Sequence, residues 1–233
     1  MLKSLGLFVF ICIMACQPMQ LPKEKHIAAI SNINDLSAKI NLTAAERTSR
    51  KAAVKIISLQ RGGHGTGTLF QIKNKLIIIT AKHVTNGEPL MQIVAPGAEM
   101  SIAKLIYEDP KSDFAALVLL GTLPSREPAM FMIKELDPEF LVGAKVFYTG
   151  YPGVHQNLTS RGYIASYEQG HLLINGYAWF GASGSGVFDN YGRLVGVLSG
   201  IDSFQGILVE DIVWVVPIKS MNRTLFLEAI KNA

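Results

Sequence analysis

Short β-prone segments, separated at close intervals by turn residues, occupy most of the chain after residue 53 and constrain its fold more than any other feature. Residues 54–59 and 76–80 are typical, because branched aliphatic residues dominate both. Turn signals such as Asn74-Lys75 and Asp189-Asn190-Tyr191-Gly192 stand between such segments. The other expected strands are residues 68–72, 91–94, 103–107, 115–119, 145–149, 161–167, 171–175, 186–188 and 194–198. This spacing predicts an all-β barrel or sandwich.

Helices are expected only at the two ends of this β-rich region. Thr43-Ala44-Ala45-Glu46 matches a capping box and predicts a short helix through about residue 53, packed on the outside of the barrel. Residues 224–231 have helical spacing. The loop-rich residues 124–138 are expected to connect two halves of the β-rich region.

Three short motifs supply a histidine, an aspartate and a serine in chain order. They are Thr80-Ala81-Lys82-His83-Val84, Asp113-Phe114-Ala115-Ala116-Leu117-Val118 and Gly181-Ala182-Ser183-Gly184-Ser185-Gly186. A serine hydroxyl is a weak nucleophile until a neighbouring imidazole takes its proton. A carboxylate must orient that imidazole and stabilise its charged form. The set therefore predicts a serine hydrolase, with His83 on a loop just after a strand.

Each of the three residues has a competitor nearby in the sequence. His64 precedes the strand that should deliver the base, so we interpret it as a surface residue. Asp109 stands directly before Pro110 and is expected to be a turn residue. Asp113 instead begins an apolar strand, where a buried carboxylate needs a partner such as an imidazole.

The three motifs together resemble those of the trypsin-like (chymotrypsin-fold) serine proteases. In that family the histidine lies in Thr-Ala-x-His, the aspartate opens an Asp-aliphatic-Ala-Leu motif, and the serine lies in Gly-x-Ser-Gly. The order His, Asp, Ser is that of the chymotrypsin type. The resemblance covers residues 53–233 and implies two six-stranded antiparallel β-barrels with the active site between them. His83 and Asp113 would come from the first barrel and Ser183 from the second.

Further segments are similar to the bacterial HtrA-type and glutamyl-endopeptidase-like branches. These are Gly150-Tyr151-Pro152, Arg161-Gly162-Tyr163-Ile164, and Val215-Val216-Pro217-Ile218 before a helix. HtrA proteins usually carry a PDZ domain after that helix. The sequence ends at this helix, so we expect no PDZ domain.

The resemblance also assigns the nucleophile and the oxyanion hole. The family nucleophile directly precedes the first glycine of Ser-Gly-x-Gly, which makes it Ser183 and not Ser185. The backbone N–H groups of Gly181 and Ser183 would stabilise the oxyanion. Trypsins have an aspartate at the position of Ala182, where it pairs with an N-terminus created by zymogen cleavage. Activation by that route is therefore not expected. Either another group stabilises the oxyanion loop, or the loop is partly disordered until substrate binds.

The same resemblance indicates which residues contact the substrate. Ser199, Gly200 and Ile201 align with the segment that pairs with substrate backbone and forms one wall of the primary pocket. Tyr177 aligns with the base of that pocket, where no acidic residue stands. We therefore expect cleavage after small or medium apolar residues rather than after arginine or lysine. Ile201 replaces a usual glycine and should narrow the entrance.

The first sixteen residues indicate export. A positive start, Met1-Leu2-Lys3, is followed by a short apolar run over residues 5–14. Residues 13–16 resemble a bacterial lipoprotein box, which would make Cys16 the lipidated first residue of the mature protein. Ordinary signal cleavage and an uncleaved anchor are the alternatives. We expect residues 1–16 to be a signal peptide, residues 17–52 a tether and helix, and residues 53–233 the protease domain.

Composition excludes several other classes of function. The net charge is only +4, with no dense cluster of basic residues, so no nucleic-acid partner is expected. The sequence has no CxxC pair, no His-x-x-x-His and no phosphate-binding loop, so neither a metal nor a cofactor is expected. The only two cysteines, Cys12 and Cys16, lie in the signal segment. The mature domain must then be held by its core without a disulfide.

These observations together predict an exported serine endopeptidase of the S1 type that acts on protein or peptide substrates. It would be tethered as a lipoprotein to the cell membrane, or on its periplasmic face, with secretion as the alternative. A binding module that keeps the protease fold without its activity is the rival prediction, supported only by Ala182. The oligomeric state is not predicted.

Overall fold

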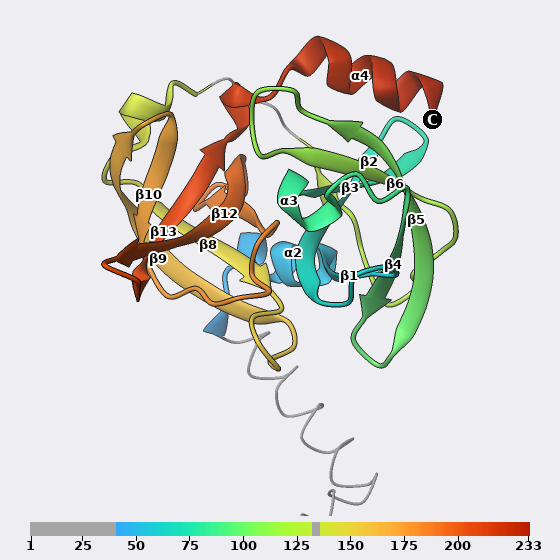
Figure 1. Ribbon diagram of the computed structural model, residues 1–233, viewed down its shortest axis with the longest axis horizontal. Helices are drawn as coiled ribbons and strands as arrows, with labels where there is room; N and C mark the ends of the chain where they lie inside the picture. The colour runs from blue at the N-terminus through green and yellow to red at the C-terminus, as the bar shows by residue number, and fades with distance from the viewer. Residues whose placement is uncertain (1–40, 132–135) are drawn as a thin grey trace, which may run out of the picture. The chain divides into compact units, whose positions relative to one another are not determined.

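The computed structural model describes residues 41–131 and 136–233 (Figure 1). Almost all of these residues belong to one unit, Leu42–Ala233. The predicted signal peptide, the lipidation at Cys16 and most of the predicted tether lie outside the described residues. No helix in the described ranges is long and apolar enough to cross a membrane.

The first half of this unit is a closed six-stranded antiparallel barrel. Its strands are β1 (Ala53–Ser58), β2 (His64–Ile72), β3 (Lys75–Thr80), β4 (Leu90–Ala95), β5 (Glu99–Glu108) and β6 (Ala115–Leu119). They follow the order β1-β4-β5-β6-β3-β2, and the pairing of β1 with β2 closes the barrel. The two-residue strand β7 (Ala129–Met130) pairs in parallel with β2 inside the predicted connecting segment.

The second half is another closed six-stranded antiparallel barrel. Its strands are β8 (Lys145–Gly150), β9 (Leu158–Glu168), β10 (His171–Asn175), β11 (Gly186–Asp189), β12 (Leu194–Phe204) and β13 (Ile207–Pro217). Their order is β10-β13-β12-β11-β8-β9. The predicted all-β, chymotrypsin-like architecture is therefore confirmed. The sequence did not predict β13 as a strand or the extension of β12 past residue 198.

Each barrel closes around its own apolar core, and a third cluster joins the barrels. Side chains such as Ile56 and Ile78 fill the first barrel, whereas Leu172 and Val215 fill the second. Phe70 of the first barrel meets Phe188 of the second, with ring centroids 6.3 Å apart. Burying one such side chain contributes about 1.5–3 kcal/mol. Apolar contact thus helps to hold the barrels together, and residues 41–131 and 136–233 contain no cysteine that could form a disulfide.

Helix α2 (Ala44–Ala52) begins with the predicted capping box. The backbone N–H of Glu46 donates to Thr43 Oγ1 at 3.2 Å, and the N–H of Thr43 donates to Glu46 Oε2 at 2.7 Å. The helix packs against strands of both barrels, including β2 and β8 (Figure 1). The hydroxyls of Ser49 and Thr149 are hydrogen bonded at 3.1 Å. The helix therefore bridges the two barrels rather than covering only one.

Helix α4 (Arg223–Asn232) ends the chain and lies over the first barrel (Figure 1). Asn222 caps its first turn by accepting from the N–H of Leu225 at 3.2 Å. Phe226 is fully buried and makes edge contacts with the rings of Tyr107 and Phe114. Three short elements complete the fold: α3 (Lys82–Thr85) and the 3-10 turns Pro138–Leu141 and Ile218–Ser220.

Candidate active site

His83 lies on the short helix α3, immediately after strand β3. The sequence predicted a loop at this position. Strand β3 is buried over its last four residues, and Ala81 continues in extended backbone before the helical turn begins. Asn86 then ends the turn in the left-handed region, with φ of 45°. The His83 side chain is 48% exposed, so its imidazole stands at the surface on a rigid support.

Asp113 holds His83 by two hydrogen bonds. Its Oδ2 lies 2.7 Å from Nδ1 of His83, and its Oδ1 accepts from the backbone N–H of His83 at 2.9 Å. Ser199 Oγ also donates to Oδ2. Because Nδ1 faces a carboxylate, it carries the proton and leaves Nε2 as the basic nitrogen. Burial raises the pKa of Asp113, but the hydrogen bonds from His83 and Ser199 outweigh burial and hold that pKa below its ordinary value.

Asp109 lies in a separate, buried position and does not contact His83. Its carboxylate accepts from Tyr107 Oη and from the N–H groups of Asn222 (2.7 Å), Lys111 (2.9 Å) and Ser112 (2.9 Å). Burial alone would raise its pKa, but these hydrogen bonds lower the pKa to about 2. Asp109 therefore joins the loop before Asp113 to the start of α4.

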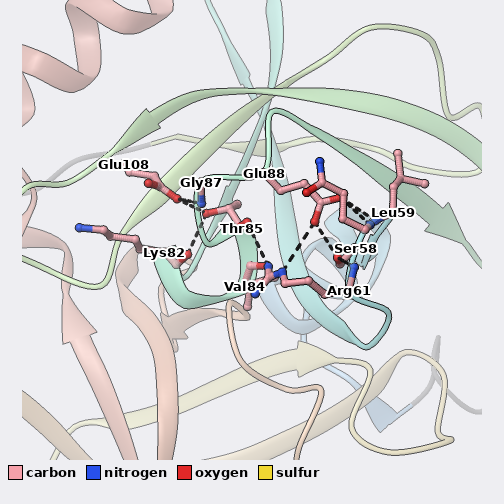
Figure 2. Close-up of polar contacts among 10 residues, drawn as sticks. Ser58, Leu59, Arg61, Lys82, Val84, Thr85, Gly87, Glu88 and Glu108 are labelled. Atoms are coloured by element: carbon pink, nitrogen blue, oxygen red, sulfur yellow. Dashed lines mark hydrogen bonds and ion pairs between the residues drawn. The ribbon is translucent and has the colours of Figure 1, made fainter.

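A second buried carboxylate, Glu88, fixes the segment around α3 (Figure 2). Glu88 is 4% exposed and accepts from Ser58 Oγ at 2.6 Å and from the N–H groups of Leu59 (2.7 Å) and Gln60 (3.1 Å). Arg61 reaches the same turn and donates to the carbonyl of Thr85 at 3.2 Å. These bonds connect the β1–β2 loop to the residues that follow His83.

Glu108 fixes the same turn from strand β5 (Figure 2). Its Oε1 accepts from the N–H of Gly87 at 2.8 Å and from Thr85 Oγ1 at 2.7 Å. Neither Glu88 nor Glu108 was identified from the sequence, because no motif marks a glutamate whose partners lie on other strands.

Two consecutive tight turns, residues 179–182 and 182–185, form the loop around Ser183, which is the second residue of the second turn. The N–H of Ala182 donates to Trp179 O at 2.9 Å, and the N–H of Ser185 donates to Ala182 O at 3.0 Å. The third residue of each turn is a glycine with positive φ, 95° at Gly181 and 89° at Gly184, as type II turns require. A Cβ at Gly184 would stand 2.1 Å from both Thr66 O and Thr80 Oγ1. Glycine is thus required there by space as well as by conformation.

The N–H groups of Gly181 and Ser183 have no hydrogen-bond partner among the described residues. Those of Ala182, Gly184 and Ser185, in the same loop, are all paired. Backbone amides away from solvent are nearly always paired, so two unpaired amides that border a cavity, in the loop of the predicted nucleophile, indicate a place for a ligand. The arrangement can bind a developing oxyanion.

The two serines of the loop differ in accessibility. Ser185 is fully buried, and its hydroxyl donates to Ala182 O at 2.7 Å. Ser183 is half-buried, and its hydroxyl donates to the carbonyl of Ser199 at 3.4 Å. Within the part of the chain that the structure describes, no hydrogen bond joins Ser183 to His83. Ser183 and His83 nevertheless line the same cavity, which has a volume of about 250 Å³. Catalytic hydrogen bonds are often long without substrate and tighten when it binds.

His64 lines this cavity too and is not the plain surface residue that the sequence suggested. It is half-buried, and its Nε2 lies 2.8 Å from Tyr151 O. The β1–β2 loop brings His64 against the loop that follows β8, a contact between residues 87 positions apart. His155 is exposed, as expected, and His171 is half-buried against the ring of Trp214.

The predicted substrate-contacting residues lie on β12 and just after β10. Gly200 and Ile201 pair with Trp214 and Val213 of β13. On the other side of β12, strand β11 pairs only as far as Val197, which leaves residues 199–201 as a free edge. Ser199 is also the residue whose hydroxyl reaches Asp113, a contact that the sequence did not predict.

The hydrogen bonds of Tyr177 with neighbouring strands are made by its backbone carbonyl rather than by its ring. The carbonyl accepts from Tyr148 Oη at 2.6 Å and from Ser160 Oγ at 2.9 Å. The side chain is 42% exposed. Its part in substrate binding stays a prediction, as does that of Ile201. Residues 41–131 and 136–233 hold no cluster of His, Cys, Asp and Glu side chains that could bind a metal ion.

Comparison with known families gives a match over more than half of the chain. The model for the trypsin-like peptidase domain matches residues 65–197, a range that contains His83, Asp113 and Ser183. No curated protein sequence shows significant similarity to the chain.

Solved structures of proteases share the fold at low sequence identity. The inactive form of a serine-to-alanine mutant of Rv3671c from M. tuberculosis aligns with a TM-score of 0.62 and 20% identity, covering 83% of this chain and 93% of that one. A serine endoprotease from Yersinia pestis gives 0.64 and 22%, over 81% and 66% of the two chains. The HtrA-type protease AlgW with a tripeptide gives 0.63 and 20%, over 81% and 62%.

Proposed function

Because the chain belongs to the trypsin-like peptidase family, we propose that it is a serine endopeptidase with Ser183 as nucleophile, His83 as base and Asp113 as orienting carboxylate. One observation carries the proposal. The two unpaired amides of Gly181 and Ser183 stand in the loop whose serine shares a cavity with the Asp113-bound imidazole.

Each group would act in a fixed order. Ser183 Oγ attacks the carbonyl carbon of the scissile bond while its proton passes to Nε2 of His83. The carbonyl oxygen becomes an oxyanion, which the N–H groups of Gly181 and Ser183 stabilise. The charged imidazole gives its proton to the leaving amine, and an acyl-enzyme remains on Ser183. Water, deprotonated by His83, then releases the acyl group and regenerates the hydroxyl.

The free edge of β12 would bind the acyl side of the substrate. An extended peptide can add a strand to such an edge, and backbone hydrogen bonds then supply affinity without sequence preference. Residues 199–201 do not line the 250 Å³ cavity, which is bounded by Arg61, His64 and Phe180. That cavity would accordingly take the leaving-group side.

Tyr177 and Ile201 are the residues that we expect to select the substrate side chain directly before the scissile bond. Neither is acidic, so we propose cleavage after small or medium apolar residues. A peptide library would show this as enrichment of alanine, valine or leucine directly before the cut. Dominance of arginine or lysine there would overturn it.

Labelling with a fluorophosphonate tests the enzyme proposal directly, because the probe reacts only with an activated serine. The wild-type protein should label and Ser183→Ala should not. Ser203→Ala, an exposed serine on the β12–β13 hairpin, is the matched control and should label normally. A wild-type protein that does not label would indicate a non-catalytic binding module. Equal labelling of Ser183→Ala would overturn the assignment of Ser183 as the nucleophile.

Export and tethering rest on the sequence of residues 1–16, and we propose a lipid anchor on Cys16. The mass of the mature N-terminus tests this. A diacylglyceryl-modified peptide that begins at Cys16 is expected. An unmodified terminus further along the chain would indicate secretion instead, and an intact residue 1 an uncleaved anchor.

A further inference from the structure

The loop that carries Ser183 has no charged anchor at position 182. Ala182 is fully buried among apolar side chains of the second barrel, so no ion pair can form there. Yet the loop is arranged with two amides free to receive an oxyanion. Some other group must hold this arrangement.

Thr66 of strand β2, in the other barrel, makes the contacts that can do so. Its side chain is fully buried, and its Oγ1 donates to the carbonyl of Gly181 at 2.7 Å. The same oxygen accepts from the N–H of Tyr151 at 3.0 Å. The backbone N–H of Thr66 donates to the carbonyl of Ser183 at 2.8 Å. One residue therefore fixes the carbonyls on both sides of Ala182.

The carbonyl of Phe180 is fixed separately. It accepts from the N–H of Gly153 at 2.7 Å. In a trans peptide the carbonyl and the N–H point in opposite directions. The bond to Gly153 therefore directs the N–H of Gly181 away from residue 153, and Gly181 borders the cavity shared by Ser183 and His83. Thr66 holds the next carbonyl by a buried hydrogen bond. Neither peptide unit beside Gly181 can therefore rotate without breaking a hydrogen bond.

We propose that Thr66 is a positioning residue that keeps the oxyanion loop formed before substrate binds, in place of a carboxylate at position 182. The proposal rests on the function proposed above. It implies that the hole needs no newly cleaved N-terminus and is present in the uncleaved domain. Thr66 touches no reacting atom and acts only through Gly181 and Ser183.

The test compares Thr66→Val with Thr68→Val. Valine has the shape of threonine without the hydroxyl, and Thr68 is a matched site on the same strand. Thr68 is buried, and its Oγ1 accepts from the N–H of Gly186 at 3.0 Å, outside the nucleophile loop. Thr66→Ser, which keeps the hydroxyl, is the rescue variant. The readouts are the fluorophosphonate labelling rate, kcat and KM on one peptide, and the melting temperature.

Thr66→Val should lower the labelling rate and kcat by about 10- to 100-fold, less than the loss of an oxyanion donor itself. KM should change by no more than about twofold, because the loss falls on the transition state. Thr66→Ser should restore most of the rate. Thr68→Val should melt at a temperature similar to that of Thr66→Val but keep the wild-type rate.

Two outcomes would overturn the proposal: Thr66→Val labelling at the wild-type rate, or Thr68→Val slowing equally. If Thr66→Val does not fold, Thr66→Ala and Thr66→Ser carry the same comparison, and equal rates for those two would overturn it. A wild-type protein that does not label would refute the proposed function itself, and is thereby distinguished from a failure at Thr66.

Discussion

Ser199 Oγ and His83 Nδ1 both bond to one oxygen of Asp113, Oδ2. Ser199 comes from the second barrel and Asp113 from the first, so this contact ties the two barrels together at the candidate site. Two donors on one carboxylate oxygen stabilise its charge, which agrees with the lowered pKa of Asp113. A charged Asp113 in turn stabilises the imidazolium of His83.

Ser199→Ala removes one of these donors without touching His83. The pKa of Asp113 should rise, since a hydrogen bond to the charged form is lost. We expect kcat/KM to fall by about tenfold or more, because one hydrogen bond to a charged group contributes about 1.5–3 kcal/mol. The pH profile of kcat/KM measures this, with Ser203→Ala as control. An unchanged rate would mean that Ser199 contributes only its carbonyl.

Asp109→Asn should affect stability rather than chemistry. The free energy of unfolding should fall by about 1–3 kcal/mol at neutral pH, because buried donors lose a charged acceptor. The folded-state pKa of Asp109 is about 2, below the ordinary value of about 3.9. The wild-type carboxylate therefore stabilises the fold above about pH 4, and this contribution is lost as pH falls towards 2.

Urea unfolding from pH 7 to pH 2 measures the effect of Asp109. The variant should lose less stability than the wild type between pH 4 and pH 2. Asp211→Asn, at an exposed position, is the control and should follow the wild-type curve. Parallel curves for Asp109→Asn and wild type would contradict the assignment.

Glu88→Gln tests the hydrogen bonds by which Glu88 joins the end of β1 and the β1–β2 loop to the segment after His83. One carboxylate oxygen becomes an NH2 group that faces donors from Ser58, Leu59 or Gln60. Stability should fall by about 1–3 kcal/mol. KM should rise, because residues 61–63 of that loop line the cavity that we propose for the leaving-group side of the substrate. Glu139→Gln changes an exposed residue and should alter neither stability nor KM. An unchanged KM in Glu88→Gln would mean that the contacts of Glu88 do not affect substrate binding.

Gly184→Ala tests whether space or backbone conformation makes this glycine necessary. Gly170 has a similar positive φ of 78°, but nothing lies within 4 Å of its virtual Cβ. Gly170→Ala should therefore cost only about 1 kcal/mol and label normally. Gly184→Ala must displace the Thr66 carbonyl or the Thr80 hydroxyl and should lose fluorophosphonate labelling as well as stability. Similar labelling and stability of Gly184→Ala and Gly170→Ala would show that backbone strain at positive φ, and not lack of space, determines the effect.

The sequence was most informative where a feature depends on neighbours along the chain. Short β-prone segments and close turns predicted the all-β class, and the capping box at Thr43 and Glu46 predicted helix α2. Both are confirmed, because strands, turns and caps are local patterns of a few residues. The long strand β13 was missed, since its first half is mostly exposed and contains Glu210 and Asp211, so it is not a continuous apolar, β-prone run.

Residue types that could perform acyl transfer, and their order along the chain, can be recognised from the sequence alone. The groups that support them become visible only in the folded protein. Thr66 reaches Gly181 across 115 residues, Ser199 reaches Asp113 across 86, and His64 reaches Tyr151 across 87. A hydrogen bond between distant residues depends on how two barrels pack, and the packing of an interface is set by the whole chain rather than by any segment of it. The residues that hold the candidate site in place are therefore found in the folded structure, whereas the candidates for the chemistry itself can be recognised in the sequence.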